Sequence, residues 1–167
     1  MTVQERFLTY VRIHTTSDEN SQTHPSADRE FELAKVLERE LKDLGLEEMT
    51  LTDKCYIYAY LPATEGMEDK KGMAFISHMD TAPDFNGKDV KPQIIENYDG
   101  GDVKLLGSGD VLSVKDFPEL ADLKGRTLIT TDGTSLLGSD DKAGVSEIMT
   151  AVETVLKENL PHGPLYI

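Results

Sequence analysis

Two residues with metal-binding chemistry, His78 and Asp80, stand two apart in the stretch FISHMDTAPDFNG (75–87), where an apolar run gives way to turn residues. On a β-strand, residues two apart point to the same side, so both side chains can face one cavity. Imidazole is a common zinc ligand, and a carboxylate on its other ring nitrogen usually fixes its orientation. Ligands of open α/β sheets also bind beyond the carboxyl ends of strands, which is where His78 stands. The spacing fits a metal site in which Asp80 orients His78, although a capping histidine beside a turn aspartate gives the same pattern.

A second acidic stretch, LLGSDDKAG (136–144), follows much later in the chain. It places Asp140 and Asp141 directly before a predicted helix, between Gly138 and Gly144. One aspartate can cap the helix. The other is then free to reach the end of the preceding strand, where a carboxylate can bridge two cations about 3.5 to 4 Å apart. A doubly acidic helix start that only complements the helix dipole is the alternative interpretation.

The remaining residues with reactive side chains carry weaker signals. His14, His24 and His162 stand at a helix end, in a polar loop and before a turn glycine, where solvated side chains are the rule. The glycines at 107–109 lack the helix of a nucleotide-binding loop, and no G-x-S-x-G nucleophile motif is present. Cys55 is the single cysteine, so it forms no internal disulfide, and its apolar setting predicts a half-buried structural position on a strand.

The composition sets the class of protein. The 167 residues are enough for one domain with its own core, and 38% hydrophobic with 29% charged residues is ordinary for a globular chain. A formal net charge of −14, from 31 acidic and 17 basic residues, argues against nucleic-acid and membrane partners, which attract clustered Lys and Arg. No apolar run approaches the length of a membrane span, and the N-terminus lacks a signal-peptide pattern. A cytoplasmic location is therefore expected.

Three helices are predicted to position these residues. The first begins at a capping box formed by Thr2 and Glu5. A polar stretch at 15–26 is expected to be a surface loop. The second helix then buries one face, made of Leu33, Leu37, Leu41 and Leu44. The third, from about 141 to 158, follows the aspartate pair and has a broad apolar face.

Short apolar runs predict the strands. The run 56–61 alternates in polarity and is expected to flank the sheet, whereas 72–77 is apolar on both faces and is expected in its centre, with helices on both sides. Runs at 126–131 and 163–167 predict two more strands. The Gly-, Pro- and Asp-rich region 82–125 is expected to make excursions over the sheet edge. Together the elements predict an α/β fold with a mixed, largely parallel sheet flanked by helices.

Taken together, SHMDTAPDFNGKDVKP (77–92) and LLGSDDKAGVSEIM (136–149) resemble the cocatalytic-zinc family of peptidases and deacylases. That family includes peptidase V, acetylornithine deacetylase and succinyl-diaminopimelate desuccinylase. The H-x-D and small-x-D-D-K-x-G patterns are shared across it, and the residues after Asp80 are most similar to its tripeptide-cleaving members. The resemblance covers essentially the whole chain. It implies that residues 1–167 are the N-terminal portion of a zinc aminopeptidase/carboxypeptidase-like catalytic domain.

The resemblance also implies roles for particular residues. His78 would ligate one zinc, Asp80 would orient His78 and tune the site, and Asp140 would bridge two zincs. Asp141 matches the second aspartate of the motif, and the peptide bond joining the two aspartates is usually cis in the family. A water shared by the two zincs would lose a proton near neutral pH and attack the scissile carbonyl. The implied activity is removal of the N-terminal residue from tripeptides.

Members of this family are well over twice as long, which implies that much of the site lies outside residues 1–167. A glutamate that acts as general base, the other zinc ligands, and a lid domain often used for dimerisation have no counterpart in the chain. The chain alone is therefore expected to be inactive, and the full-length form is expected to bind a small peptide substrate as a homodimer. Two alternatives stay open: an N-acyl amino acid deacylase of the same family, and a non-catalytic fragment.

Overall fold

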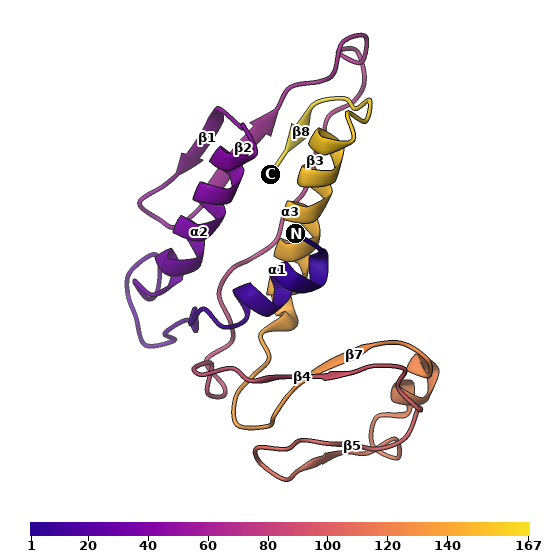
Figure 1. The fold of residues 1–167 in the computed structure, drawn as a ribbon. Helices are drawn as coiled ribbons and strands as arrows, with labels where there is room; N and C mark the ends of the chain where they lie inside the picture. The colour runs from indigo at the N-terminus through magenta and orange to yellow at the C-terminus, as the bar shows by residue number, and fades with distance from the viewer. The chain divides into compact units, whose positions relative to one another are not determined.

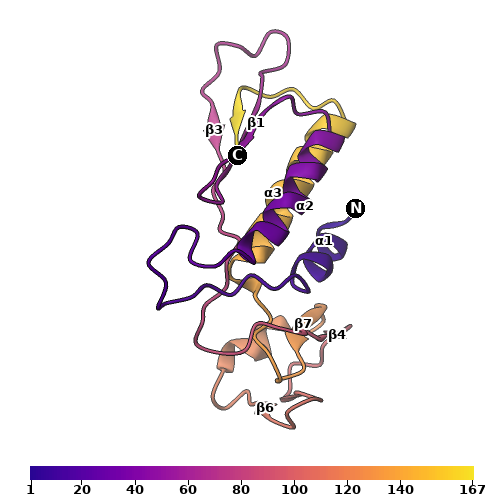
Figure 2. The same ribbon diagram turned by 90° about the vertical axis from the view of Figure 1, so that its left-hand side faces the viewer.

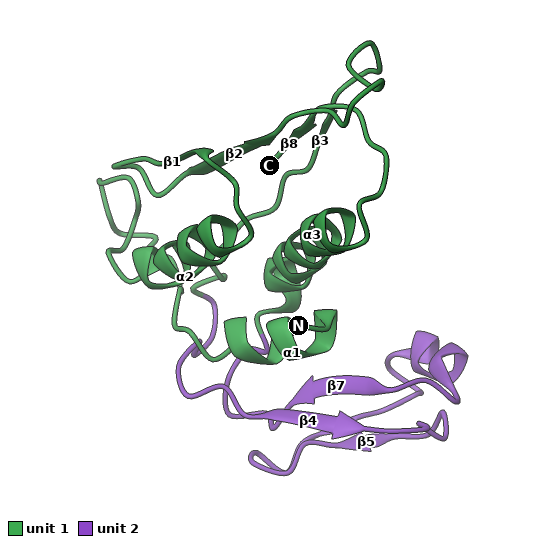
Figure 3. Ribbon diagram, turned by 45° about the horizontal axis from the view of Figure 1, so that its top comes forward, with its two compact units in different colours: residues 1–83, 138–167 green, residues 84–137 purple.

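The structure of the chain, a computed structural model, describes residues 1–167 and divides into two compact units. Unit 1 comprises Met1–Pro83 and Gly138–Ile167, and unit 2 comprises Asp84–Leu137 (Figure 3). The two acidic stretches that carry the candidate site residues therefore both contribute to unit 1. No helix of the chain is both long and apolar enough to cross a lipid bilayer.

The elements of each unit are as follows (Figure 1). Unit 1 contains α1 (Val3–Tyr10), α2 (Glu30–Asp43), β1 (Glu48–Leu51), β2 (Ile57–Leu61), β3 (Met73–Ala74), α3 (Ser139–Lys157) and β8 (Leu165–Tyr166). Unit 2 contains β4 (Pro92–Ile95), β5 (Val103–Lys104), β6 (Val111–Leu112), the 3-10 helix η1 (Pro118–Leu123) and β7 (Leu128–Thr131).

The three predicted helices are present in unit 1. α1 begins at the predicted capping box, in which the Glu5 backbone N–H donates to Thr2 Oγ1 at 3.2 Å and the Glu5 carboxylate accepts from the Thr2 backbone N–H at 2.8 Å. Both α2 and α3 lie on one face of the main sheet, as Figures 2 and 3 show. The core of unit 1 forms between them; its buried members are Tyr10, Leu33, Leu37, Leu41, Leu46, Ala59, Val145, Met149 and Val152.

The main sheet of unit 1 has the strand order β1-β2-β8-β3. β1 pairs antiparallel with β2, β2 pairs antiparallel with β8, and only β8 and β3 are parallel. The predicted mixed α/β fold is confirmed, but the expectation that the sheet is largely parallel is wrong for these strands. The reason is the short turn between β1 and β2, since two strands joined by a tight turn must run antiparallel, whereas a parallel pair needs a long crossover such as α3.

Within residues 1–167 the helices α2 and α3 cover one face of the main sheet. Alternation along the strands shows the two faces. Ala59 of β2 and Leu165 of β8 are buried toward the helices, while their neighbours Tyr58 and Tyr166 are exposed on the other face. The strands therefore have the one-sided burial that is common in antiparallel sheets.

The strand predicted at 72–77 is shorter than expected and lies at the sheet edge. It is limited to Met73–Ala74, and Ile76 is 92% exposed. Its ladder with β8 ends where the Phe75 N–H donates to the Tyr166 carbonyl at 2.8 Å. Beyond Phe75 the apolar run continues without strand hydrogen bonds to other residues of 1–167.

Unit 2 is a compact body with its own core, which corrects the expectation of loose excursions across 82–125. β4 pairs antiparallel with β7, and β5 pairs antiparallel with β6. The predicted strand at 126–131 is therefore present as β7, but it belongs to this small sheet. Its core residues are spaced too irregularly for a periodic signal; they are Tyr98, Val103 and Leu105, packed by Ile95, Leu112, Leu120, Leu123 and Leu128.

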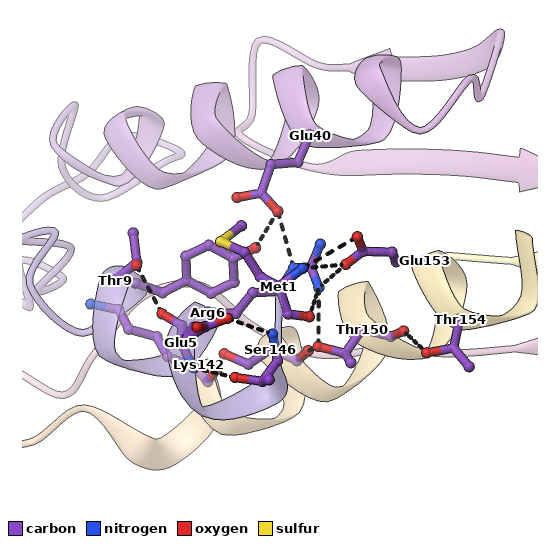
Figure 4. A network of polar contacts seen from close by, with 12 residues as sticks. Met1, Glu5, Arg6, Thr9, Glu40, Lys142, Ser146, Thr150, Glu153 and Thr154 are labelled. Atoms are coloured by element: carbon purple, nitrogen blue, oxygen red, sulfur yellow. Dashed lines mark hydrogen bonds and ion pairs between the residues drawn. The ribbon is translucent and has the colours of Figure 1, made fainter. Parts of the chain in front are cut away.

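Arg6 of α1 joins the three helices of unit 1 through a polar network (Figure 4). Its Nε lies 3.1 Å from Glu40 Oε2 on α2, and its Nη1 lies 2.6 Å from Glu153 Oε2 on α3. The Tyr10 hydroxyl donates to the same Glu40 oxygen at 2.8 Å. Arg6 is buried, so these carboxylates replace the water that its guanidinium loses on folding. The network thus fixes the spacing of α1, α2 and α3.

Candidate metal centre

His78 follows β3 on the extended segment that leaves the sheet edge. Its Nδ1 lies 3.0 Å from Asp80 Oδ1 and 3.1 Å from the Asp80 backbone oxygen. Both partners are hydrogen-bond acceptors, so Nδ1 carries the proton and donates to Asp80. Nε2 is the ring nitrogen on the opposite side, where a metal ion would replace the contact with Asp140.

Asp140 reaches the other side of the same imidazole from the start of α3. His78 Nε2 lies 3.0 Å from Asp140 Oδ1, and the Asp140 side chain is 95% exposed. The sequence separation of the two residues is 62. The structure therefore brings the two predicted ligands into direct contact within unit 1, with a second carboxylate oxygen of Asp140 open to solvent.

Of the two aspartates, Asp141 is the one that caps α3. Asp140 and Asp141 have non-helical backbone angles, so the regular helix begins at Lys142. Asp141 Oδ1 accepts from the Gly144 backbone N–H at 3.2 Å, which satisfies one of the free donors at the helix start. The peptide bond between Asp140 and Asp141 is cis, as the family resemblance implies.

Ser77 connects the two site segments next to the His78 contact. Its hydroxyl donates to Asp141 Oδ2 at 2.6 Å and also lies 3.1 Å from the Asp141 backbone oxygen. Gly144 leaves room for this arrangement, because a Cβ there would lie 2.5 Å from Asp141 Oδ1. Ser77 and Gly144 thus hold Asp141 inward, and Asp140 consequently projects outward.

The electrostatics of the site favour positive charge. Burial disfavours the imidazolium of His78, but hydrogen bonds to Asp140 and Asp80 outweigh that effect and raise its pKa above the ordinary value. Asp80 and Asp140 thus place one carboxylate at each nitrogen of the ring. A cation placed between His78 Nε2 and Asp140 would compete with the imidazole proton for the same electron pairs.

The two donors are of chemical types that bind zinc, but a catalytic zinc normally has more protein ligands than two. An imidazole nitrogen oriented by a carboxylate, together with a free carboxylate oxygen, is typical of zinc ligation. A catalytic zinc normally has three protein ligands, and no group of three or more His, Cys, Asp or Glu residues in the chain gathers to hold a metal ion. Residues 1–167 therefore offer two convergent donors, fewer than a catalytic zinc normally takes.

A groove of about 920 Å³ in unit 1 opens beside these residues. His78 and Asp80 contribute to its lining, together with apolar side chains of α2 and α3 such as Leu41 and Met149. Cys55 also lines the groove, but it occupies a buried turn position with a positive φ of 63° instead of the predicted strand position. Burial raises the pKa of its thiol to about 11, which agrees with a structural role.

Sequence reasoning missed one group of residues near the site. Thr15 and Thr16, expected in a surface loop, are buried, and the Thr15 hydroxyl donates to the Met79 carbonyl at 2.7 Å. Lys142 is also buried, and burial lowers its pKa to about 8. No periodic pattern marks such residues, because each forms a hydrogen bond with a group distant in the chain: Thr15 and Lys142 with backbone carbonyls, and Thr16 with the Thr81 hydroxyl. For Thr15 and Thr16, the only feature of the sequence that could have indicated burial is that two β-branched residues stand together after the first helix.

Comparison with solved structures shows which known fold the chain has. The chain shares its fold with the aminopeptidase PepT of Bacillus cereus, at a TM-score of 0.62 and 24% identity over 98% of this chain and 34% of that chain. A tripeptidase from Staphylococcus aureus gives a TM-score of 0.60 and 20% identity, with the same coverage. The architecture is therefore the fold of solved aminopeptidases. No family model matches the chain.

Sequence comparison identifies the particular relatives. Peptidase T of Caldanaerobacter subterraneus is 53% identical over 99% of this chain and 41% of its own length. Peptidase T of Clostridium perfringens is 51% identical, and that of a Geobacillus strain 52% identical, over 99% and 98% of this chain. The chain is similar to peptidase T along nearly its whole length, and it spans about 40% of the length of these relatives.

Proposed function

We propose that the protein carrying this chain is a zinc-dependent aminopeptidase that removes the N-terminal residue from tripeptides. The observation that carries the proposal is the 3.0 Å approach of His78 Nε2 to Asp140 Oδ1 in a chain homologous to peptidase T. The solved structures that share its fold are described as an aminopeptidase and a tripeptidase, which is consistent with this activity. A cytoplasmic location and a homodimer in the full-length form stay predictions.

In this proposal His78 and Asp140 hold zinc, with two ions per complete site, and Asp80 acts through His78. Zinc supplies Lewis-acid polarisation of a peptide carbonyl and a nucleophilic water near neutral pH. Asp80 keeps the imidazole in the tautomer that leaves Nε2 available, and it raises the basicity of that nitrogen. The carboxylates around His78 also favour the positively charged α-ammonium of a peptide substrate.

The donor count leads to a second part of the proposal. Two donors cannot hold two zincs, so the other ligands and the general-base carboxylate are proposed to lie in the parts of the relatives that this chain does not span. General-base catalysis is typically worth about 10² to 10⁴ in rate. Residues 1–167 by themselves are accordingly proposed to be inactive.

The direct test replaces the two ligands in the complete natural protein. His78→Ala and Asp140→Asn should each lose bound zinc, measured by elemental analysis, and should lower kcat/KM for a tripeptide by about 10³ or more, since both ligation and polarisation fail. His24→Ala is the matched control, because His24 is an exposed histidine of the loop between α1 and α2. It should leave zinc content and turnover unchanged.

Asp80→Asn separates orientation from ligation. The variant should keep most of its zinc and lose about 10- to 100-fold in rate, since loss of an orienting partner weakens the ligand before coordination fails. Zinc loss in proportion to rate would instead make Asp80 a direct ligand.

Two outcomes would contradict the proposed function as a whole. Full zinc content and activity in His78→Ala would refute it, and cleavage of N-acyl amino acids in place of tripeptides would identify a deacylase.

A further inference from the structure

The candidate site is assembled from two segments that are distant in sequence, 77–81 and 138–142. Two direct contacts join them at the site: the exposed pair of His78 and Asp140, and the hydrogen bond from the Ser77 hydroxyl to Asp141 Oδ2 at 2.6 Å. Exposed ion pairs contribute little free energy, so the His78–Asp140 contact adds little to holding the two segments in place. A third segment supports them in addition to the Ser77 hydrogen bond.

A third segment of unit 1, Ile13–Ser17, contacts both site segments; we call it the connector because it leads from α1 toward α2. It forms a parallel bridge with the segment after Asp80, pairing Thr16 with Thr81. The Thr81 N–H donates to the Thr15 carbonyl at 3.1 Å, and the Thr15 hydroxyl donates to the Met79 carbonyl at 2.7 Å. The residues Thr15, Thr16 and Thr81 are buried. Their hydrogen bonds are therefore shielded from water.

The connector holds the second site segment through Lys142, the first regular helical residue after the aspartate pair. Lys142 is only 2% exposed, and its Nζ donates to the Ile13 carbonyl at 2.7 Å. No Asp or Glu carboxylate in the chain lies within ion-pair distance of this Nζ, although the carboxylates of Asp80 and Asp140 contact His78 at the nearby site. Burying a cation against a single carbonyl is costly, so stability of the fold does not by itself account for a lysine here.

The two site segments also touch where the connector meets them. Gly138 has a left-handed φ of 77°, and a Cβ at this position would lie 3.1 Å from Thr81 Cγ2 and 3.9 Å from Lys142 Nζ. The connector, the segment after His78 and the start of α3 therefore pack together at one point. Small movements of Lys142 would shift Asp140, since only Asp141 separates them in the chain.

We propose that the connector is a positioning element of the candidate metal centre, and that it holds the His78 and Asp140 segments in register through Lys142 and Thr15. The inference rests on the proposed function. Lys142 and Thr15 contact neither the proposed metal nor substrate, so they act by placing the residues that do. Their role is to form the pair of donors before a metal arrives, which lowers the cost of ordering the site.

The test uses the complete natural protein and three substitutions. Lys142→Met removes Nζ and keeps the length of the side chain, Thr15→Val removes the hydroxyl and keeps its shape, and Thr15→Ser restores the hydroxyl. Zinc affinity is measured by competition with a chromogenic chelator, and amide hydrogen exchange at Thr81 is measured in the zinc-free protein. Thr154→Val is the matched control, because its hydroxyl donates to the Thr150 carbonyl of α3 at 2.8 Å, away from the site.

Lys142→Met and Thr15→Val should weaken zinc binding by about 10- to 100-fold, in the range of other residues that support metal ligands, while Thr15→Ser and Thr154→Val bind zinc like the wild type. Exchange at the Thr81 amide should quicken in the two weakened variants even without zinc, since its acceptor is on the connector. Wild-type zinc affinity in both variants, with His78→Ala still defective, overturns the positioning role and leaves the proposed function standing. Absence of zinc binding in the wild type overturns both.

Discussion

His78 is oriented by two carboxylates that approach its ring from opposite sides. Asp80 is a near neighbour in the chain, whereas Asp140 arrives from a distant helix start, and each lies 3.0 Å from one ring nitrogen. These contacts are at least partly exposed, so their importance is chemical and their share in the stability of the fold is small. Among single ion pairs, the buried pair of Arg6 and Glu153 is the one expected to contribute to the stability of the fold.

Glu153→Gln tests that pair through its pH dependence. Hydrogen bonds from Lys157, the N-terminal ammonium and Arg6 lower the pKa of Glu153 to about 2. Because the folded-state pKa lies below the unfolded value, the stabilisation is fully present above about pH 4.5 and is lost as the pH falls toward 2. At pH 7 the variant should lose about 2 kcal/mol in the free energy of unfolding, measured in urea.

The difference between wild type and Glu153→Gln should shrink steadily between pH 4.5 and pH 2. Glu147→Gln is the control on the same helix, since Glu147 is exposed, and it should stay within about 0.5 kcal/mol of the wild type. A difference for Glu153→Gln that is independent of pH down to 2 would contradict the charged network as its source.

At the scale of elements, the start of α3 decides where the two aspartates point. The backbone stays non-helical through Asp140 and Asp141, and Asp141 then caps the regular helix. Gly144 permits this, because any side chain there would collide with the Asp141 carboxylate. The position of Asp140 at the candidate site is therefore a consequence of how the helix begins.

The variant Gly144→Ala tests whether the collision with Asp141 outweighs the higher helix propensity of alanine. In an open helix the change should stabilise by about 1 kcal/mol, since Ala is the better helix former. The 2.5 Å approach of the new Cβ to Asp141 Oδ1 should instead displace the cap and destabilise by about 1 to 2 kcal/mol, measured by thermal unfolding. The control is Ala151→Gly, at an exposed position of α3, which measures the difference in helix propensity between alanine and glycine without a collision. A gain in stability for Gly144→Ala would contradict the prediction, because it would show that Asp141 can move aside at no cost.

At the scale of the whole molecule, the chain offers a convergent pair of donors and spans about 40% of the relatives it matches. The two donors belong to unit 1, and unit 2 forms a separate core around Tyr98, Val103 and Leu105. A pair of donors gives a divalent cation part of its coordination shell, with water completing the remainder.

Zinc titration of residues 1–167 by calorimetry should therefore show weak binding, about 100-fold or more below that of the complete natural protein, and no cleavage of a tripeptide. His78→Ala should abolish the residual binding, because only one protein donor is then left. Tight binding of two zincs by residues 1–167 would show that other side chains of the chain complete the site and that the donor inventory is wrong.

The sequence alone was informative wherever neighbouring residues determine the structure. The capping box of Thr2 and Glu5, the apolar stripe of α2, and the pairing of His78 with Asp80 all depend on residues a few positions apart, whose spacing follows from the period of a helix or strand. Two acidic residues before a helix likewise predicted one cap and one free carboxylate, and the structure assigns these to Asp141 and Asp140.

Tertiary structure decided what depends on partners distant in the chain. The pairing of 72–77 depends on β8, which lies far along the chain, and whether Thr15 and Lys142 are exposed depends on carbonyls of Met79 and Ile13. Such hydrogen bonds leave no periodic trace in the sequence, because a buried polar group needs one partner in space and places no constraint on where that partner stands in the chain.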